Sequence, residues 1–203
     1  KEGLLAEEDV QRLQEFYQII SDLYTDNLAF QSKVSCSNEK EGFPSSHLTD
    51  GREDTFWVPT SDETAYVLEI DLGQTRSFNL VEIREPIAKG QRIAGFTLEV
   101  KQETGWTDFA RGQTIGYKRL LLGEMVEARY LRLILTDFQA LPLLNKFAVY
   151  KTPAVLEKKK TVAALEFSKI SSLLVGGQNL SISLRRLDKV EDREKIQIVT
   201  EPG

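Results

Sequence analysis

Apolar side chains recur at steps of three and four residues in the first stretch of the chain, between Leu4 and Tyr24. The positions are Val10, Leu13, Phe16, Tyr17, Ile20, Leu23 and Tyr24. This spacing forms one apolar stripe along an α-helix. Acidic residues at positions 7–9 fall in the expected first turn, where negative charge favours the helix dipole. The pattern predicts a connector helix within residues 1–26, whose stripe packs either on its own domain or on a different one.

From residue 27 onward the apolar period changes to two. Short runs of β-branched and aromatic residues are separated by turn-forming strings such as DLGQT, AKGQ and ALP. The runs are residues 66–72, 78–84, 93–101, 129–136 and 146–151. Alternation is clearest in Leu68, Ile70 and Leu72, and again at positions 131, 133 and 135. About eight short strands at this spacing predict an all-β fold, an antiparallel β-sandwich over residues 27–152.

A boundary follows the sandwich. The string PAVLEKKK at residues 153–160 combines a proline with a run of charge. Alternation beyond it, in residues 161–200, predicts further strands. Since about fifty residues make a small core on their own, we expect residues 153–203 to form a short β-rich extension or part of a further domain.

Composition removes several classes of function. With 26 Lys and Arg against 31 Asp and Glu, the net charge of −5 argues against nucleic acid as a partner. One cysteine, Cys36, excludes an internal disulfide and a cysteine-based metal cluster, and one histidine, His47, excludes a multi-histidine zinc site. No apolar run reaches 18 residues, so no membrane span is expected. Binding modules and carboxylate-based chemistry remain.

A set of strings between residues 48 and 150 carries a family resemblance. LTDGREDTFW begins at Leu48, VLEIDLG at Val67, RYLRL at Arg129 and FAVY at Phe147. In this order and spacing they resemble the discoidin domain, also called the coagulation factor 5/8 type C domain, whose family includes the family 32 carbohydrate-binding modules. The resemblance implies a galactose-binding-like antiparallel β-sandwich.

Two longer strings are similar to a narrower group. FNLVEIREPIAKGQRI at residues 78–93 and GQTIGYKR at residues 112–119 resemble the discoidin-type C-terminal domain of family 29 α-L-fucosidases. The helical segment, with DVQRL at residues 9–13, is similar to the connector from their catalytic barrel. The resemblance implies a non-catalytic fragment of a retaining glycoside hydrolase that braces the barrel and binds carbohydrate. The alternative is an independent lectin or adhesion module of the discoidin type.

The catalytic barrel of that family is longer than this chain, which bears on the activity to be expected. A (β/α)8 barrel needs about 250 residues, and this chain has 203 in all. We therefore expect the chain alone not to hydrolyse fucosides. The expected partners are the catalytic barrel of the parent enzyme and glycans that contain fucose or galactose. The resemblance also implies a bacterial enzyme that is exported, to the periplasm or the medium.

The loop between Arg84 and Arg92 is the first candidate for sugar binding. Fucose-binding lectins of this fold, which resemble this segment, hold the sugar with two arginines. Arg92-Ile-Ala-Gly fits the second of them and Arg84 the first. The planar donors of arginine suit neighbouring hydroxyl groups. The structural alternative is that the two arginines pair with Glu82 or Glu85, or contact the barrel.

His47 and Trp57 complete the candidate sugar site. His47 stands upstream of the position at which those lectins use a histidine, so its alternative is an exposed loop residue. Trp57 and Trp106 could stack on a sugar face, but both positions match core tryptophans in the discoidin pattern. For both tryptophans we expect core packing.

The string around Asp50 matches a metal loop. In many relatives the positions of Asp50, Asp54 and Thr55 supply oxygen ligands to a structural Ca²⁺, an ion that takes six to eight oxygens. Those relatives add a glutamate just before the last strand, where this chain has Lys146. Because an ammonium group repels the ion, we expect no cofactor and an ion pair of Lys146 with Asp50 or Asp54 instead. Calcium in this loop is the alternative.

Overall fold

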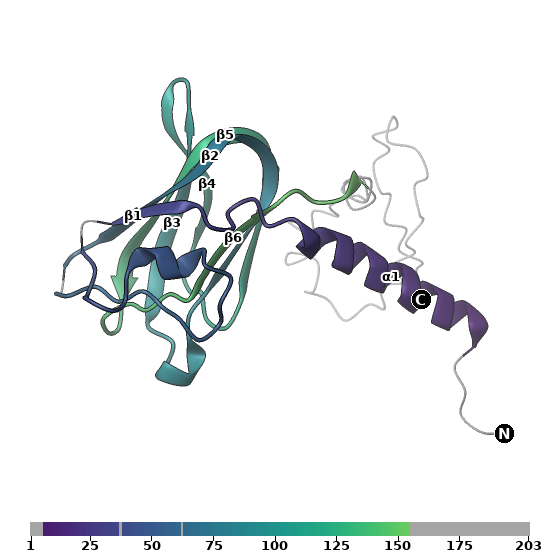
Figure 1. The fold of residues 1–203 in the computed structure, drawn as a ribbon, viewed down its shortest axis with the longest axis horizontal. Helices are drawn as coiled ribbons and strands as arrows, with labels where there is room; N and C mark the ends of the chain where they lie inside the picture. Colours follow the sequence, from purple (N-terminus) through teal and green to yellow (C-terminus); the bar gives the residue numbers. More distant parts are fainter. Residues whose placement is uncertain (1–5, 37, 62, 155–203) are drawn as a thin grey trace, which may run out of the picture. The chain divides into compact units, whose positions relative to one another are not determined.

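One helix and six antiparallel strands make up the part of the chain that the structure describes, residues 6–36, 38–61 and 63–154 of a computed structural model (Figure 1). In chain order they are α1 (Glu7–Thr25), β1 (Lys33–Cys36), β2 (Tyr66–Arg84), β3 (Ile93–Gln102), β4 (Gly105–Gly112), β5 (Arg119–Phe138) and β6 (Lys146–Tyr150). Two short 3-10 helices, η1 (Ser45–Leu48) and η2 (Ile87–Lys89), lie in the loops. None of the described helices is long and apolar enough to cross a membrane.

The chain divides into two units, Lys1–Pro153 and Ala154–Gly203. The second unit lies almost wholly outside the described residues, and with it the β-rich extension predicted for residues 153–203.

The long strands β2 and β5 form the centre of the sandwich. The sheet order is β1-β2-β5-β3-β4, and β6 also pairs with β2. The first half of β2 pairs with β1 and with the second half of β5, whereas its second half pairs with β6 and with the first half of β5. Figure 1 shows β2 and β5 curving together, so that the sheet folds over on itself. The predicted antiparallel β-sandwich is confirmed.

The string DLGQT does not end a strand, as the sequence predicted, but bends one. The register of β2 against β5 shifts between Asp71, opposite Tyr130, and Arg76, opposite Ala128. Gly73 takes a φ of 78°, and its N–H donates to Oδ1 of Asp71 at 2.8 Å. Such a bulge bends a strand and increases its twist without ending it. The expected strands 66–72 and 78–84 are therefore one strand of 19 residues.

The main core lies between the two halves of the folded sheet. The predicted alternation is confirmed, since Leu68 and Ile70 in β2 and the three leucines at positions 131, 133 and 135 in β5 are buried. The largest fully buried side chains include Trp57, Tyr66, Phe78 and Phe147. This core fixes the sheet and leaves the loops and the outer faces to carry function.

The helix α1 packs on the sandwich through its C-terminal end. Leu23 and Tyr24 join Leu80, Ala148 and Tyr150 in a second, smaller apolar cluster on the outer face of β2 and β6. The Tyr24 ring meets the Tyr150 ring edge-on, with centroids 5.1 Å apart. The preceding turns, with Val10, Leu13, Phe16 and Tyr17, are 38% to 72% exposed. The predicted helix is confirmed, and only the end of its apolar stripe packs on this domain.

Candidate functional site

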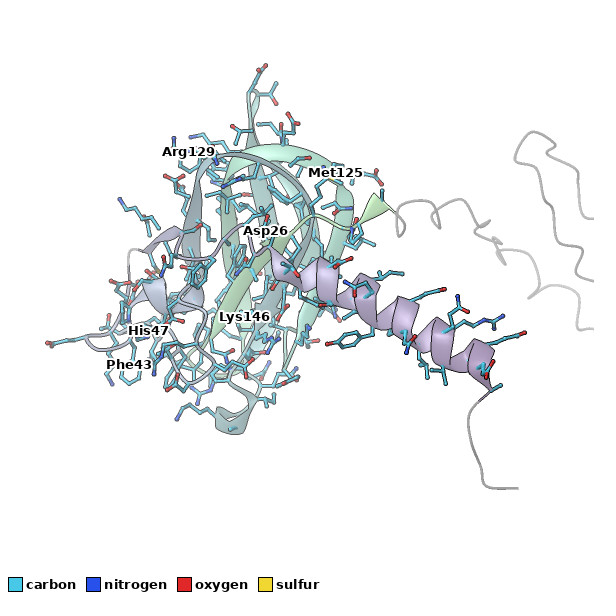
Figure 2. All side chains as sticks on the ribbon, turned by 45° about the vertical axis from the view of Figure 1, so that its right-hand side comes forward. Asp26, Phe43, His47, Met125, Arg129 and Lys146 are labelled. Atoms are coloured by element: carbon cyan, nitrogen blue, oxygen red, sulfur yellow. The ribbon has the colours of Figure 1, made fainter. Side chains whose placement is uncertain are left out.

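Loops at one end of the sandwich bring together an aromatic pair, a histidine and a lysine. The rings of Phe43 and Phe56 lie 5.0 Å apart and are tilted by 36°. Nδ1 of His47 lies 3.0 Å from the Phe56 carbonyl oxygen, so Nδ1 carries the hydrogen and donates it. Nζ of Lys89 lies 5.0 Å from the centroid of the Phe56 ring. Figure 2 shows Phe43 and His47 together, with Arg129 at the opposite end.

The loop that carries Lys89 is held by one buried carboxylate. Glu85 is 1% exposed, and its Oε1 accepts from the main-chain N–H groups of Arg92 at 2.7 Å and Ile93 at 3.1 Å. Its Oε2 accepts from the N–H of Gly116 at 2.7 Å. Because carboxylate bonds to N–H groups are among the stronger hydrogen bonds, Glu85 fixes both loop 86–92 and the turn at Gly116.

Arg92 lies in this loop region and bonds to main-chain carbonyls. Its Nη1 donates to Leu141 O at 3.0 Å, and its Nε and Nη2 donate to Lys89 O at 3.3 and 3.0 Å. The Arg92 guanidinium thus ties loop 86–92 to residue 141. The expected alternative of a contact with Glu85 is present, but it runs through the main-chain N–H of Arg92.

Arg84 lies in a different cluster, on the outer face of the second half of β2. Its guanidinium pairs with the fully buried Glu82 and, at 3.1 Å, with Glu53. It also stacks on Tyr117, with Cζ 5.5 Å from the ring centroid. Burial opposes the charge, but the Glu82 carboxylate outweighs it and raises the pKa of Arg84. Arg84 and Arg92 therefore share no partner among the described residues, and Glu82 is the pairing partner that the structural alternative named.

The prediction that Lys146 pairs with Asp50 or Asp54 is wrong. Its Nζ lies 3.5 Å from Oε1 of Glu82. The reason is strand register: Lys146 opposes Arg84 across β2 and β6, so Glu82 is its diagonal neighbour on the same face of the sheet. Nζ of Lys118 completes the cluster at 3.7 Å from Oε2 of Glu82.

The loop of Asp50, Asp54 and Thr55 is closed by its own hydrogen bonds. Asp50 accepts from Arg52 N and from the Thr55 hydroxyl, both at 2.8 Å. Both oxygens of Asp54 accept from the Arg52 guanidinium, at 3.1 and 2.8 Å, and this bond lowers the pKa of Asp54. In the described part of the chain, no group of three His, Cys, Asp or Glu residues could hold a metal ion. An ion that takes six to eight oxygens would have to displace these hydrogen bonds.

The two tryptophans differ in environment. Trp57 is 0% exposed and lies edge-on to Tyr66 at 5.8 Å, so its ring presents no face to a sugar. The expectation that Trp106 packs in the core is wrong. It is half-buried at the start of β4, with Cζ of Arg132 at 4.4 Å and Nζ of Lys101 at 5.8 Å from its ring centroid. Because β4 is the outermost strand of the sheet, its side chains are only partly covered.

Sequence reasoning missed three residues of this loop end. Phe43 and Phe56 stand in loops beside Pro44 and Trp57, and Lys89 stands in AKGQ, a string that marks only a turn. Their one signal is the presence of aromatic residues in loop segments that need none for a core. The two loops are joined at Val58, whose N–H donates to Phe43 O at 3.3 Å and whose carbonyl oxygen accepts from Lys40 N at 2.8 Å. The sequence indicates neither bond.

Comparison with known sequences places most of the described chain in one family. The F5/8 type C domain family matches residues 32–144. Alpha-L-fucosidase 1 of Arabidopsis thaliana is 34% identical over 156 residues, which cover 73% of this chain and 31% of the relative. The chain thus spans about a third of the length of the curated relatives it matches.

Solved structures give the same result. SpGH29 superposes with a TM-score of 0.71 and 43% identity, over 74% of this chain and 33% of its own. A Ruminococcus gnavus GH29 fucosidase in complex with fucose superposes with a TM-score of 0.69 and 27% identity, over 74% of this chain and 32% of its own. Because both the sequence match and the folded antiparallel sheet cover the sandwich, the chain belongs to the F5/8 type C domain family.

Proposed function

We propose that the chain is a non-catalytic accessory domain of an α-L-fucosidase and that it packs on the remainder of that enzyme through α1. The similarity to fucosidases that are more than twice as long supports this role. The observation that carries it is the stripe of α1, which is buried at Leu23 and exposed from Val10 to Tyr17. A helix that is apolar along one face needs a second surface to cover it.

In this role the domain stabilises the enzyme and takes no part in the hydrolysis. Hydrolysis by two carboxylates requires a substrate cleft between them, and we place that cleft in the remainder of the enzyme. The domain contributes apolar area to the shared interface, at about 25 cal/mol per Å² buried, and so stabilises the fold of the enzyme.

A chimeric enzyme tests this role. In it, residues 1–154 replace the matching third of SpGH29, and release of 4-nitrophenol from 4-nitrophenyl α-L-fucoside is measured before and after heating. We expect no release by the isolated chain, and a longer half-life for the chimera than for SpGH29 without that third. Turnover by the isolated chain, or equal half-lives, would contradict the proposal.

The loops that carry Phe43, Phe56 and Lys89, at one end of the sandwich, favour a second function. The half-buried Phe43–Phe56 pair offers apolar ring surface, Lys89 offers donors for hydroxyl groups, and Glu85 holds the loop rigid. Aromatic rings flanked by a few polar groups are the usual composition of a small-ligand site. We propose that this end binds fucose- or galactose-containing glycans, with His47 and Arg92 as positioning residues. If the chain binds glycans and does not dock on an enzyme, the independent lectin is the better account.

Titration with L-fucose and D-galactose, followed by NMR, tests the glycan site. We expect shifts at Lys89 and Phe56 with a Kd of about 1–10 mM, a free energy of roughly −3 to −4 kcal/mol. Lys89→Met should weaken binding at least about threefold. Lys101→Met is the matched control, since Lys101 also covers aromatic rings but on β3. No shifts, or an equal effect of the two variants, would contradict this site.

A further inference from the structure

Exposed apolar side chains are concentrated on two segments of the described chain. Of eleven large hydrophobic residues that are exposed there, eight lie on α1 or between residues 117 and 125. They are Val10, Leu13, Phe16 and Tyr17 on α1, Tyr117 just before β5, and Leu120, Leu122 and Met125 in the first half of β5. Single exposed apolar residues are ordinary, but such a concentration marks an interaction surface.

The two segments meet at the base of α1. Leu122 opposes Leu80 and Leu120 opposes Glu82 across β5 and β2, and directly opposed residues share a face of the sheet. Leu80 packs in the small cluster with Leu23 and Tyr24 of α1. The exposed leucines of β5 therefore lie on the same outer face on which α1 ends. We name the stripe of α1 together with Leu120 and Leu122 the docking face.

Positive charge is in excess where the docking face crosses the sheet, around Glu82. The buried Glu82 is surrounded by three cations, Arg84, Lys118 and Lys146. Among the residues that the structure describes, Glu53 forms an ion pair with Arg84 alone. The two lysine side chains remain 29% and 26% exposed. Within this cluster two carboxylates stand against three cations, whereas α1 is acidic, with Glu7, Glu8, Asp9, Glu15 and Asp22 against Arg12. The positive charge is therefore confined to the sheet side of the docking face, where it fits one acidic side chain of a partner beside an apolar surface.

We propose that the docking face binds the remainder of the same fucosidase, through an apolar surface of that partner bordered by a carboxylate that pairs with Lys118 or Lys146. The occupant follows from continuity with the stripe of α1 and from fucosidase relatives that extend well beyond the matched part, so this inference rests on the proposed function. The two lysines set only the charge of the group that borders it. The proposed function places only α1 in the contact with the enzyme. This inference adds Leu120 and Leu122 on the sheet, and the two lysines beside them. In this assignment Arg84 acts at an interface between domains.

Calorimetry of the chimera tests this assignment. We expect one cooperative unfolding transition for the chimera, and two for the double variant Leu120→Glu with Leu122→Glu, whose charges oppose burial in the interface. Val67→Glu is the matched control, because Val67 is 43% exposed on the other half of β2. It should keep one transition. The isolated chain with both leucines replaced should keep its melting temperature, which shows that the domain still folds.

The outcomes separate the two proposals. Two transitions in the unaltered chimera would overturn the proposed function and this inference together. One transition in both the chimera and the double variant would overturn the docking face and leave the accessory role standing. If the isolated chain forms a dimer that the double variant abolishes, while the chimera is unaffected, then the face binds a second copy and the assignment is wrong.

Discussion

The ammonium group of Lys118 lies 4.2 Å from the centroid of the Tyr24 ring, so a residue just before β5 stacks on the last turn of α1. Tyr150 meets the same ring edge-on. Because Lys118 is also an ion-pair partner of Glu82, the base of α1 is attached to the sandwich by an apolar cluster and by a charge network. This attachment sets the direction in which the exposed stripe of α1 leaves the domain.

Removal of the buried charge at Glu82 should destabilise the domain. Glu82→Gln would leave three cations close together without their carboxylate, and loss of one partner from a buried ion pair costs about 3–5 kcal/mol. Since the two lysines are partly exposed, we expect the free energy of unfolding in urea to fall by about 2–3 kcal/mol. Glu103→Gln, at an exposed position of the β3–β4 turn, is the control. A change below that of the control would contradict a structural role for Glu82.

The stability of the domain should fall at alkaline pH through Tyr150. Burial, and next the charge of Glu82, raise the pKa of Tyr150 above its ordinary value of about 10. The unfolded chain therefore loses this proton more readily, so the contribution is fully present below about pH 10 and is lost as pH rises above it. Urea unfolding at pH 8 and pH 10.5 should show a smaller loss of stability for Tyr150→Phe than for the unaltered chain. Equal losses would mean that Tyr150 is not the group responsible.

Calcium should not stabilise the domain. The oxygens of Asp50 and Asp54 already accept hydrogen bonds, and the Arg52 guanidinium holds Asp54 where an ion would need free oxygens. We expect the melting temperature to be the same in millimolar CaCl2 and in EGTA. Arg52→Ala removes the internal cation and serves as the sensitive variant. A rise in melting temperature of the unaltered chain with calcium would show that the loop opens to bind the ion.

Local pattern predicted the elements whose side chains meet one continuous core. The leucines at positions 131, 133 and 135 alternate because one face of β5 is buried along that stretch. The helix α1 could be predicted because its apolar residues recur at the helical period along its whole length. The bend at Gly73 could not be predicted, since a turn and a bulge use the same residue types.

The candidate site was harder to predict because its members meet through register. Lys146 reaches Glu82 because Lys146 of β6 lies opposite Arg84 of β2. Phe43 reaches Phe56 because the main chain of Val58 bonds to the loop that carries Phe43. Trp106 was expected in the core because its position matches a core tryptophan of the discoidin pattern. It lies on the outermost strand instead, and that position in the sheet cannot be read from the residues. The motifs predicted the family. The ion-pair cluster at Glu82 could not be predicted, because it depends on which residues the paired strands place side by side.

Amide hydrogen exchange of α1 measures directly whether this helix is covered by the rest of the enzyme. In the isolated chain, the turns from Val10 to Tyr17 carry exposed side chains, so their amides should exchange rapidly. In the chimera with the remainder of SpGH29, we expect exchange in these turns to be slowed by at least about tenfold, with β1 unchanged as the internal control. Equal exchange of α1 in the two proteins would contradict an accessory domain that docks through this helix.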